Sequence, residues 1–213
     1  MPIRIRQHVN PLARKFQAPM PIPDWQEIYQ NKDLPIHLDI GCARGRFLLS
    51  MAEQNRDVNY LGIEIREPLV ESANKERDSL GLTNLHYLFG NMNSSAEILL
   101  KSLPANSLNT ISVQFPDPWF KKKHNKRRVV QPDLVKVLVD YLANGGEVFL
   151  QSDVKEVAVE MRDRFIADSR LVRQHSDEWL AVNPFPVPTE RELYVLKQNL
   201  PVYRVLLQKS ATS

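Results

Sequence analysis

The sequence contains one cysteine, Cys42, among 213 residues, so an internal disulfide is excluded. Its five histidines are scattered, and no Cys/His cluster has the spacing of a zinc site. No apolar run approaches the roughly 18 residues of a membrane span, and the N-terminus lacks the apolar core of a signal peptide. We therefore expect a cytoplasmic protein that needs no metal, no disulfide and no membrane.

The remaining composition is that of an ordinary globular protein, with 43% hydrophobic and 25% charged residues. Residues 1–23 carry four basic side chains and five prolines with no acidic residue, and a capping box at Asp24 to Glu27 opens a short helix. We expect a basic arm and short helix over residues 1–32 and a single domain over 33–213. The arm has two open interpretations, a nucleic-acid contact or a disordered terminus.

From residue 34 onward, apolar strand patterns alternate with helical patterns. This alternation predicts an α/β fold with a doubly wound, mostly parallel sheet. The expected strands lie near residues 34–40, 60–63, 85–89, 108–115, 147–151, 171–175 and 202–207. The expected helices begin near residues 46, 68, 94, 132, 155 and 190, with Ser94 as the cap of the third.

Polar residues stand at the carboxyl ends of five successive predicted strands. They are Asp39, Glu64, Asn91, Asp117 and Asp153. In an open α/β sheet these strand ends share one edge, and ligands bind in the crevice outside it. The alternative is that each residue only marks a strand end or a helix cap.

The turn after the first strand carries Gly41 and Gly45, but Ala43 and Arg46 occupy the second and third glycine positions of a dinucleotide fingerprint. A dehydrogenase is therefore disfavoured, because the backbone loses its close approach to a pyrophosphate. A ligand with a ribose and an adenine but no phosphate suits the turn better.

The most unusual stretch is residues 112–128, where an apolar strand leads into Asp117 between two prolines, then Trp119 and Phe120. Six of the eleven residues after Asp117 are basic, although the whole chain has a net charge of only +3. Such a segment suits a phosphate backbone with an unstacked base nearby. A solvated charge run or a targeting tag is the alternative.

With these residues in place, the chain resembles the TrmB family of bacterial tRNA (guanine-N7-)-methyltransferases over about residues 33–207. The most specific part is Phe115-Pro-Asp-Pro-Trp119 with the cations that follow. The resemblance implies a class I S-adenosylmethionine (SAM)-dependent, Rossmann-like fold with an antiparallel C-terminal strand. It also implies an enzyme that binds tRNA and methylates guanosine 46 of the variable loop at N7.

The resemblance implies roles for individual residues, with Asp117 as the catalytic position. The implied cofactor-binding residues are Asp39, Gly41, Gly45, Glu64, Asn91 and Asp117. The implied substrate-binding residues are Lys121, Asp153, Thr189, Glu190, Arg191 and Glu192. The implied RNA-binding residues are Lys123, His124, Asn125, Lys126, Arg127 and Arg128. The chain departs from the family at Ala43, Asn91 and Phe120, where glycine, aspartate and proline are common.

The chemistry suggests how these groups act. Glu64 has the placement of an acid that accepts both ribose hydroxyls, and Asp39 that of a group holding the methionine portion of the cofactor. Guanine N7 carries no proton, so Asp117 is expected to orient the base rather than deprotonate it, with Asp153 as a second candidate for the guanine edge. Trp119 or Phe120 is a candidate stacking partner for a base that has left its stack.

Two other functions stay open at this point. One is a class I methyltransferase for a small molecule or another RNA, and the other is an RNA-binding protein with a vestigial cofactor pocket. The sequence does not distinguish a monomer from a homodimer.

Overall fold

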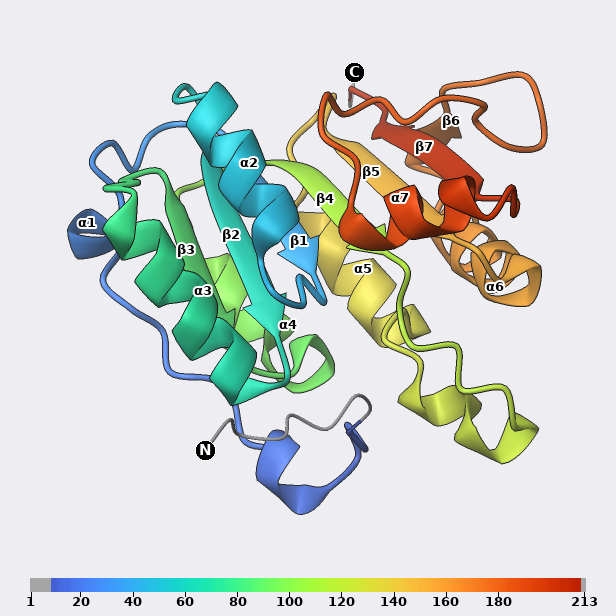
Figure 1. Ribbon diagram of the computed structural model, residues 1–213, viewed down its shortest axis with the longest axis horizontal. Coiled ribbons are helices and arrows are strands. Elements are labelled where there is room, and N and C mark those ends of the chain that lie inside the picture. The colour runs from blue at the N-terminus through green and yellow to red at the C-terminus, as the bar shows by residue number, and fades with distance from the viewer. Residues whose placement is uncertain (1–8, 212–213) are drawn as a thin grey trace.

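A computed structural model describes residues 9–211 and shows a seven-stranded sheet with the order β3-β2-β1-β4-β5-β7-β6 (Figure 1). Neighbours among the first five strands run parallel, and β7 runs antiparallel to both β5 and β6. The strands are β1 (Ile36–Ile40), β2 (Asn59–Glu64), β3 (Leu85–Phe89), β4 (Leu108–Gln114), β5 (Glu147–Ser152), β6 (Leu171–Arg173) and β7 (Tyr203–Lys209). The predicted mostly parallel sheet with an antiparallel C-terminal strand is confirmed.

Helices cover both faces of the sheet (Figure 1). On one face lie α2 (Arg46–Gln54), α3 (Glu67–Ser79) and α7 (Glu190–Lys197), and on the other lie α4 (Met92–Ser102), α5 (Pro132–Tyr141) and α6 (Lys155–Ile166). Three shorter elements are the 3₁₀ helices η1 (Arg14–Phe16) and η2 (Lys122–Arg127) and the helix α1 (Trp25–Ile28).

The chain leaves β1 toward β2 on one side and later returns to β4 on the other, so the strand order reverses between β1 and β4. Every residue of β1 and β2 is buried, as expected for parallel strands covered on both faces. Two apolar clusters fill the space between the sheet and its helices, one around Leu99, Leu138 and Phe165 and the other around Phe47 and Val70. This packing places the carboxyl ends of the central strands at one edge.

The start of α4 corrects one sequence prediction. The helix begins at Met92 rather than after Ser94, and Asn91 is its cap, since the Asn91 side chain accepts a hydrogen bond from the Asn93 backbone N–H. Ser94 lies within the first turn, where its hydroxyl donates to the Asn91 carbonyl. Both residue types favour caps, so sequence preference alone did not identify the correct one.

Residues 9–32 do not form a separate arm. Met20, Trp25 and Tyr29 are buried in the same cluster as the central strands. The Trp25 indole N–H donates to Ser102 Oγ at 3.0 Å, and the Tyr29 hydroxyl donates to the Tyr60 carbonyl at 3.1 Å. The predicted division at residue 33 therefore does not correspond to a boundary in the packing. Arg4 and Arg6, two of the four basic residues of the predicted arm, lie outside the described residues.

The burial of Trp25 predicts a large effect on stability. We expect Trp25→Ala to lower the free energy of unfolding by about 3–5 kcal/mol, because it removes a side chain that is 7% exposed and stacks on Tyr29 with ring centroids 5.9 Å apart. Urea denaturation followed by circular dichroism measures this change. Leu12→Ala is the control, since Leu12 is half exposed and its loss should stay within about 0.5 kcal/mol. Equal effects of the two changes would show that the N-terminal segment is not part of the core.

Candidate functional site

A cavity of about 790 Å³ opens at the carboxyl-terminal edge of the sheet. This volume lies within the usual range for a small-molecule or cofactor site. The five polar residues predicted to converge there all line it, namely Asp39, Glu64, Asn91, Asp117 and Asp153. The structure thus brings together residues that are up to 114 positions apart in the sequence.

Asp39 is buried near the end of β1, where the strand register pairs it with Ser112 of β4. Its Oδ1 accepts hydrogen bonds from Ser112 Oγ at 2.6 Å and from Gln114 Nε2 at 3.3 Å. Burial raises the pKa of Asp39 to about 6, against the lowering effect of these two hydrogen bonds. The Asp39 carboxylate is therefore poorly solvated and would gain from a cationic ligand.

The turn after β1 needs its two glycines. Gly41 and Gly45 have φ of +84° and +74°, values that residues other than glycine adopt only with strain. A Cβ on Gly45 would also lie 2.6 Å from the ring of Tyr87, whose hydroxyl donates to the Gly45 carbonyl. Gly41 lines the cavity, and Gly45 is the N-cap of α2. Ala43, the departure from glycine, has φ of +51°.

Glu64 ends β2 and is held by four hydrogen bonds. Its Oε1 accepts from the backbone N–H and the Nε of Arg66 at 3.0 and 2.9 Å. Its Oε2 accepts from the Ala43 backbone N–H at 2.9 Å and from Arg66 Nη2 at 3.1 Å. A carboxylate offers about four acceptor positions, and these four bonds occupy them.

Asn91 has structural contacts in addition to its place in the cavity wall. Its side-chain N–H₂ donates to the carbonyls of Pro11 and Phe16, both at 3.2 Å, while its Oδ1 caps α4. The segment before α1 is therefore tied to the cavity, and Val9 and Pro11 line part of it.

Asp117 lies on a loop with unusual backbone angles. Phe115 and Trp119, on either side of it, have φ of +50° and +43° without being glycine, a conformation that costs about 1–3 kcal/mol per residue. Such conformations persist only where the surrounding structure holds them in place, and they are common at active sites. The loop carries Asp117 into the cavity wall, whereas Lys121 is exposed at the start of η2 and is not among the lining residues.

The two aromatic residues of this loop have different environments. The Trp119 ring meets His124 edge-on with centroids 5.6 Å apart, and the Arg127 guanidinium lies 4.9 Å from its centre. Phe120 is 69% exposed, although it too lines the cavity. Of the two candidates for stacking, Phe120 is the ring that offers an open face.

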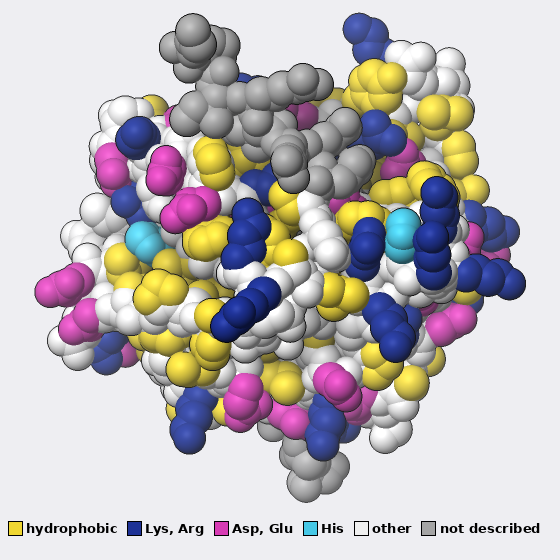
Figure 2. Space-filling view, turned by 90° about the horizontal axis from the view of Figure 1, so that it is seen from below, with side chains coloured by type: hydrophobic (Ala, Val, Ile, Leu, Met, Phe, Trp, Pro, Cys, Tyr) yellow, Lys and Arg dark blue, Asp and Glu magenta, His cyan; other side chains and the backbone are white. Residues whose placement is uncertain are grey.

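The predicted RNA-binding residues belong to η2 and its C-terminal cap. Lys123 and Lys126 are exposed, His124, Asn125 and Arg127 are half-buried, and Arg127 also lines the cavity. Figure 2 views the molecule from below Figure 1 and shows Lys and Arg side chains gathered on the side where η2 lies. Arg128 differs, because its side chain is buried and its guanidinium is bonded to protein acceptors.

The first turn of α7 completes the opposite wall. Thr189 Oγ1 accepts a hydrogen bond from the Glu192 backbone N–H at 3.1 Å, which confirms the predicted helix cap. Glu190 forms an ion pair with Arg46 of α2, and Arg191 forms one with Asp153 after β5. Both pairs are partly exposed at the cavity mouth, where such pairs contribute little to stability and can exchange partners.

Glu192 lies behind this wall and not in the cavity. It is 1% exposed, and its carboxylate accepts from Arg204 Nη2 at 2.6 Å, Asn183 Nδ2 at 2.7 Å and Gln151 Nε2 at 3.2 Å. Gln151 in turn donates to Gln114 Oε1 at 2.8 Å, so hydrogen bonds connect Glu192 to Asp39. The sequence analysis did not identify Gln114, Gln151 or Arg204 as part of the site. The signal that could have identified them is their position as polar residues at or near the ends of apolar strands.

The described part of the chain, residues 9–211, contains neither a metal-binding group of side chains nor a membrane-spanning helix. No three His, Cys, Asp or Glu side chains gather closely enough to hold a metal ion. No helix within the same range is long and apolar enough to cross a membrane.

Comparison with known proteins identifies the family. Residues 33–205 match the family model described as "Putative methyltransferase". The chain is 58% identical to the tRNA (guanine-N(7)-)-methyltransferase of Microcystis aeruginosa over 97% of this chain and 98% of that protein. It is 55% identical to the protein of the same name from Synechocystis sp. over 98% of each.

Among solved structures, the 30S ribosomal A1408 methyltransferase from an uncultured bacterium superposes with a TM-score of 0.55 and 13% identity, over 88% of this chain and 94% of that one. At this identity the likeness establishes the fold alone, and it confirms the predicted class I methyltransferase fold. With its matched family model and near full-length relatives, the chain belongs to the tRNA (guanine-N(7)-)-methyltransferase family.

Proposed function

We propose that this protein transfers the methyl group of S-adenosylmethionine to N7 of guanosine 46 in the variable loop of tRNA. The observation that carries the proposal is the loop of residues 115–128, which joins a cofactor-sized cavity containing Asp117 to a cationic surface on η2. The name shared by the relatives supports the same chemistry. Since its substrate would be tRNA, we place the protein in the cytoplasm.

The cavity suits S-adenosylmethionine, which supplies an electrophilic methyl group on a sulfonium. Asp39 Oδ1 is engaged by Ser112 and Gln114, which leaves Oδ2 to accept from the cofactor's ammonium group. Glu64 would accept the ribose hydroxyls once the Arg66 side chain gives up its two hydrogen bonds. Gly41 lines the same cavity and adds no side chain to it.

Asp117 would act on the base and not on a proton at N7. The N7 lone pair of neutral guanine lies in the ring plane and is already free to attack the methyl group. Asp117 would accept from N1–H or the exocyclic amine, on the edge of the base away from N7, and offset the positive charge that develops on the purine. Preorganised charge and correct alignment of this kind supply several kcal/mol of barrier reduction.

Recognition of the tRNA would combine stacking and phosphate contacts. The open ring of Phe120 at the cavity mouth would stack on the target base after it leaves its own stack. The exposed cations of η2, including Lys123 and Lys126, would contact phosphates on either side. Arg128 is left out of this surface because it is buried.

A direct test uses tritium-labelled S-adenosylmethionine and two unmodified tRNA transcripts, one with guanosine and one with adenosine at position 46. We expect label only in the first transcript, at a nucleotide that is cleaved by the chemistry specific for N7-methylguanosine. Equal label in both transcripts would contradict the assignment of position 46. Label in neither, with cofactor still bound, would contradict tRNA as the substrate.

Asp117→Asn tests the role of the loop carboxylate. The change keeps the shape of the side chain and removes its charge, so we expect kcat to fall by about 10²-fold or more while the Kd for tRNA stays nearly constant. Single-turnover methylation with saturating enzyme measures the chemical step. Asp57→Asn, at an exposed turn, is the matched control and should leave the rate unchanged. A normal rate for Asp117→Asn would rule out electrostatic help from this residue.

The pKa of Asp39, raised to about 6 by burial, predicts a pH dependence for cofactor binding. Asp39 is ionised above this value, so affinity for the cationic cofactor should be full near pH 7 and fall by about tenfold toward pH 5 as the carboxyl gains a proton. His37 contributes no charge in this window, because burial lowers its pKa to about 3. Calorimetry at several pH values measures the change. Asp39→Asn should bind more weakly and with a flatter pH profile, and a flat profile in the unsubstituted protein would contradict the role of Asp39.

The salt dependence of tRNA binding tests the cationic surface of η2. Replacing Lys123 and Lys126 together by glutamine should reduce the slope of log K against log salt concentration by about one to two, because up to two phosphate contacts are lost. Filter binding over a salt series measures the slope. Lys75→Gln, on the exposed face of α3, is the control. An unchanged slope in the double variant would show that η2 is only a solvated charged segment.

A further inference from the structure

Arg128 is the one member of the basic stretch 121–128 that the structure buries, with 4% of its surface exposed. Each guanidinium nitrogen has a protein acceptor. The Nε donates to the Pro118 carbonyl at 2.8 Å, Nη2 donates to Glu156 Oε1 at 2.8 Å, and Nη1 donates to Glu160. A phosphate could reach this cation only by displacing these partners, so its role differs from that of the exposed lysines beside it.

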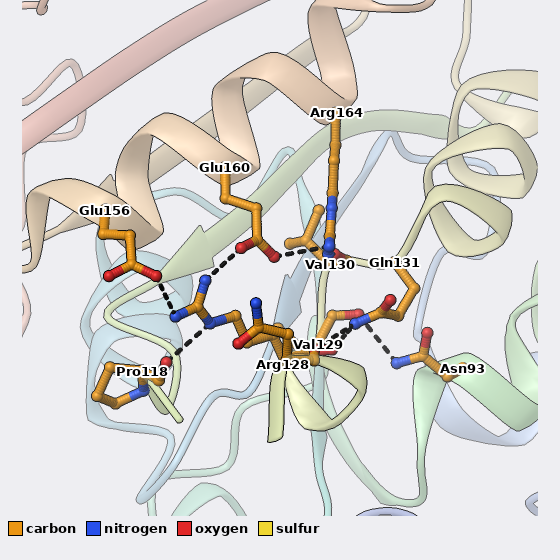
Figure 3. Close-up of polar contacts among 10 residues, drawn as sticks. Asn93, Pro118, Arg128, Val129, Val130, Gln131, Glu156, Glu160 and Arg164 are labelled. Atoms are coloured by element: carbon orange, nitrogen blue, oxygen red, sulfur yellow. Dashed lines mark hydrogen bonds and ion pairs between the residues drawn. The ribbon is translucent and has the colours of Figure 1, made fainter. Parts of the chain in front are cut away.

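The two carboxylates come from one side of α6. Glu156 and Glu160 are four residues apart and therefore stand one above the other on the helix. Arg164, one turn further along, forms an ion pair with Glu160 at 2.7 Å and donates to the Val130 carbonyl. Figure 3 shows the Arg128 guanidinium between the two glutamates, with Pro118 on its remaining side. The helix thus provides two carboxylates that bind the Arg128 guanidinium.

The third acceptor, the Pro118 carbonyl, connects Arg128 to the loop that carries Asp117. Pro118 directly follows Asp117, on the loop whose backbone is strained at Phe115 and Trp119. At the other end of the loop, Gln131 Nε2 donates to the Arg128 carbonyl at 2.7 Å and to the Asn125 carbonyl at 3.1 Å, which closes η2. A single guanidinium therefore holds the beginning and the end of the segment 118–128 against α6.

We propose that Arg128 is a positioning residue that holds Asp117 in the cavity through the Pro118 carbonyl, and that it is not a ligand for tRNA phosphate. This inference rests on the proposed function, because Asp117 is the group being positioned. A shift of about 1 Å in an aligned group can cost as much as 10²-fold in rate. Loss of the Arg128 contacts should therefore affect turnover and leave the electrostatics of tRNA binding unchanged.

Two substitutions separate the two roles. For Arg128→Gln we expect kcat at saturating tRNA and cofactor to fall at least about tenfold, with the KM for tRNA changed less than about twofold and the salt slope of binding unchanged. Glu160→Gln keeps every cation of the loop but removes a charge that binds Arg128, so it should also lower kcat. Asp163→Asn is the matched control, since Asp163 is an exposed acid of α6 whose carboxylate pairs with Arg162 of the same helix. It should leave kcat and KM unchanged.

A phosphate contact at Arg128 would give the opposite result, a salt slope reduced by about 0.7–0.9 in Arg128→Gln with kcat at saturation retained. If Arg128→Gln does not fold, Glu160→Gln decides, because normal turnover in that variant would overturn the proposal.

Hydrogen exchange over residues 116–128 without tRNA gives a readout independent of activity. We expect faster exchange in Glu160→Gln than in Asp163→Asn, and equal exchange would also overturn the proposal. If the unsubstituted protein methylates no tRNA, the proposed function fails, while the exchange result still decides whether the Arg128 contacts hold the loop.

Discussion

The site depends on a largely buried chain of hydrogen bonds that crosses the sheet at its carboxyl-terminal edge. It runs from Asp39 of β1 through Gln114 of β4 and Gln151 of β5 to Glu192 at the start of α7. The strand register places Asp39 beside β4 and Gln114 opposite Gln151, so the chain of hydrogen bonds exists only when β1, β4 and β5 pair correctly. Buried polar groups are costly unless every partner is present, and this requirement fixes both walls of the cavity relative to each other.

The loop that carries Asp117 needs a second set of contacts, because it lies beyond the end of β4. Its prolines and its left-handed residues at positions 115 and 119 limit its conformations without selecting one. The buried Arg128 supplies the missing constraint from α6. The exposed cations of η2 are left to face solvent, so one short basic segment contains residues with two different physical roles.

The sequence predicted the parts of this structure that local patterns determine. Alternating strand and helix patterns gave the doubly wound sheet, and polar residues after successive strands gave the wall of the cavity. The burial of Glu192 and Arg128 could not be read from the sequence, because their partners lie on β5, β7 and α6, far away along the chain. The same applies to residues 9–32, where prolines and basic residues suggested an arm although Trp25 and Tyr29 pack into the core.

In the proposed reaction the N7 lone pair of one guanine is the nucleophile, and the protein orients that guanine. The most direct measurement compares methyl transfer to tRNA containing guanosine or 7-deazaguanosine at position 46, which differ by the replacement of N7 with a C–H group. We expect both tRNAs to bind with similar affinity and only the first to accept a methyl group. Methyl transfer to the 7-deaza tRNA at a comparable rate would contradict the proposed reaction.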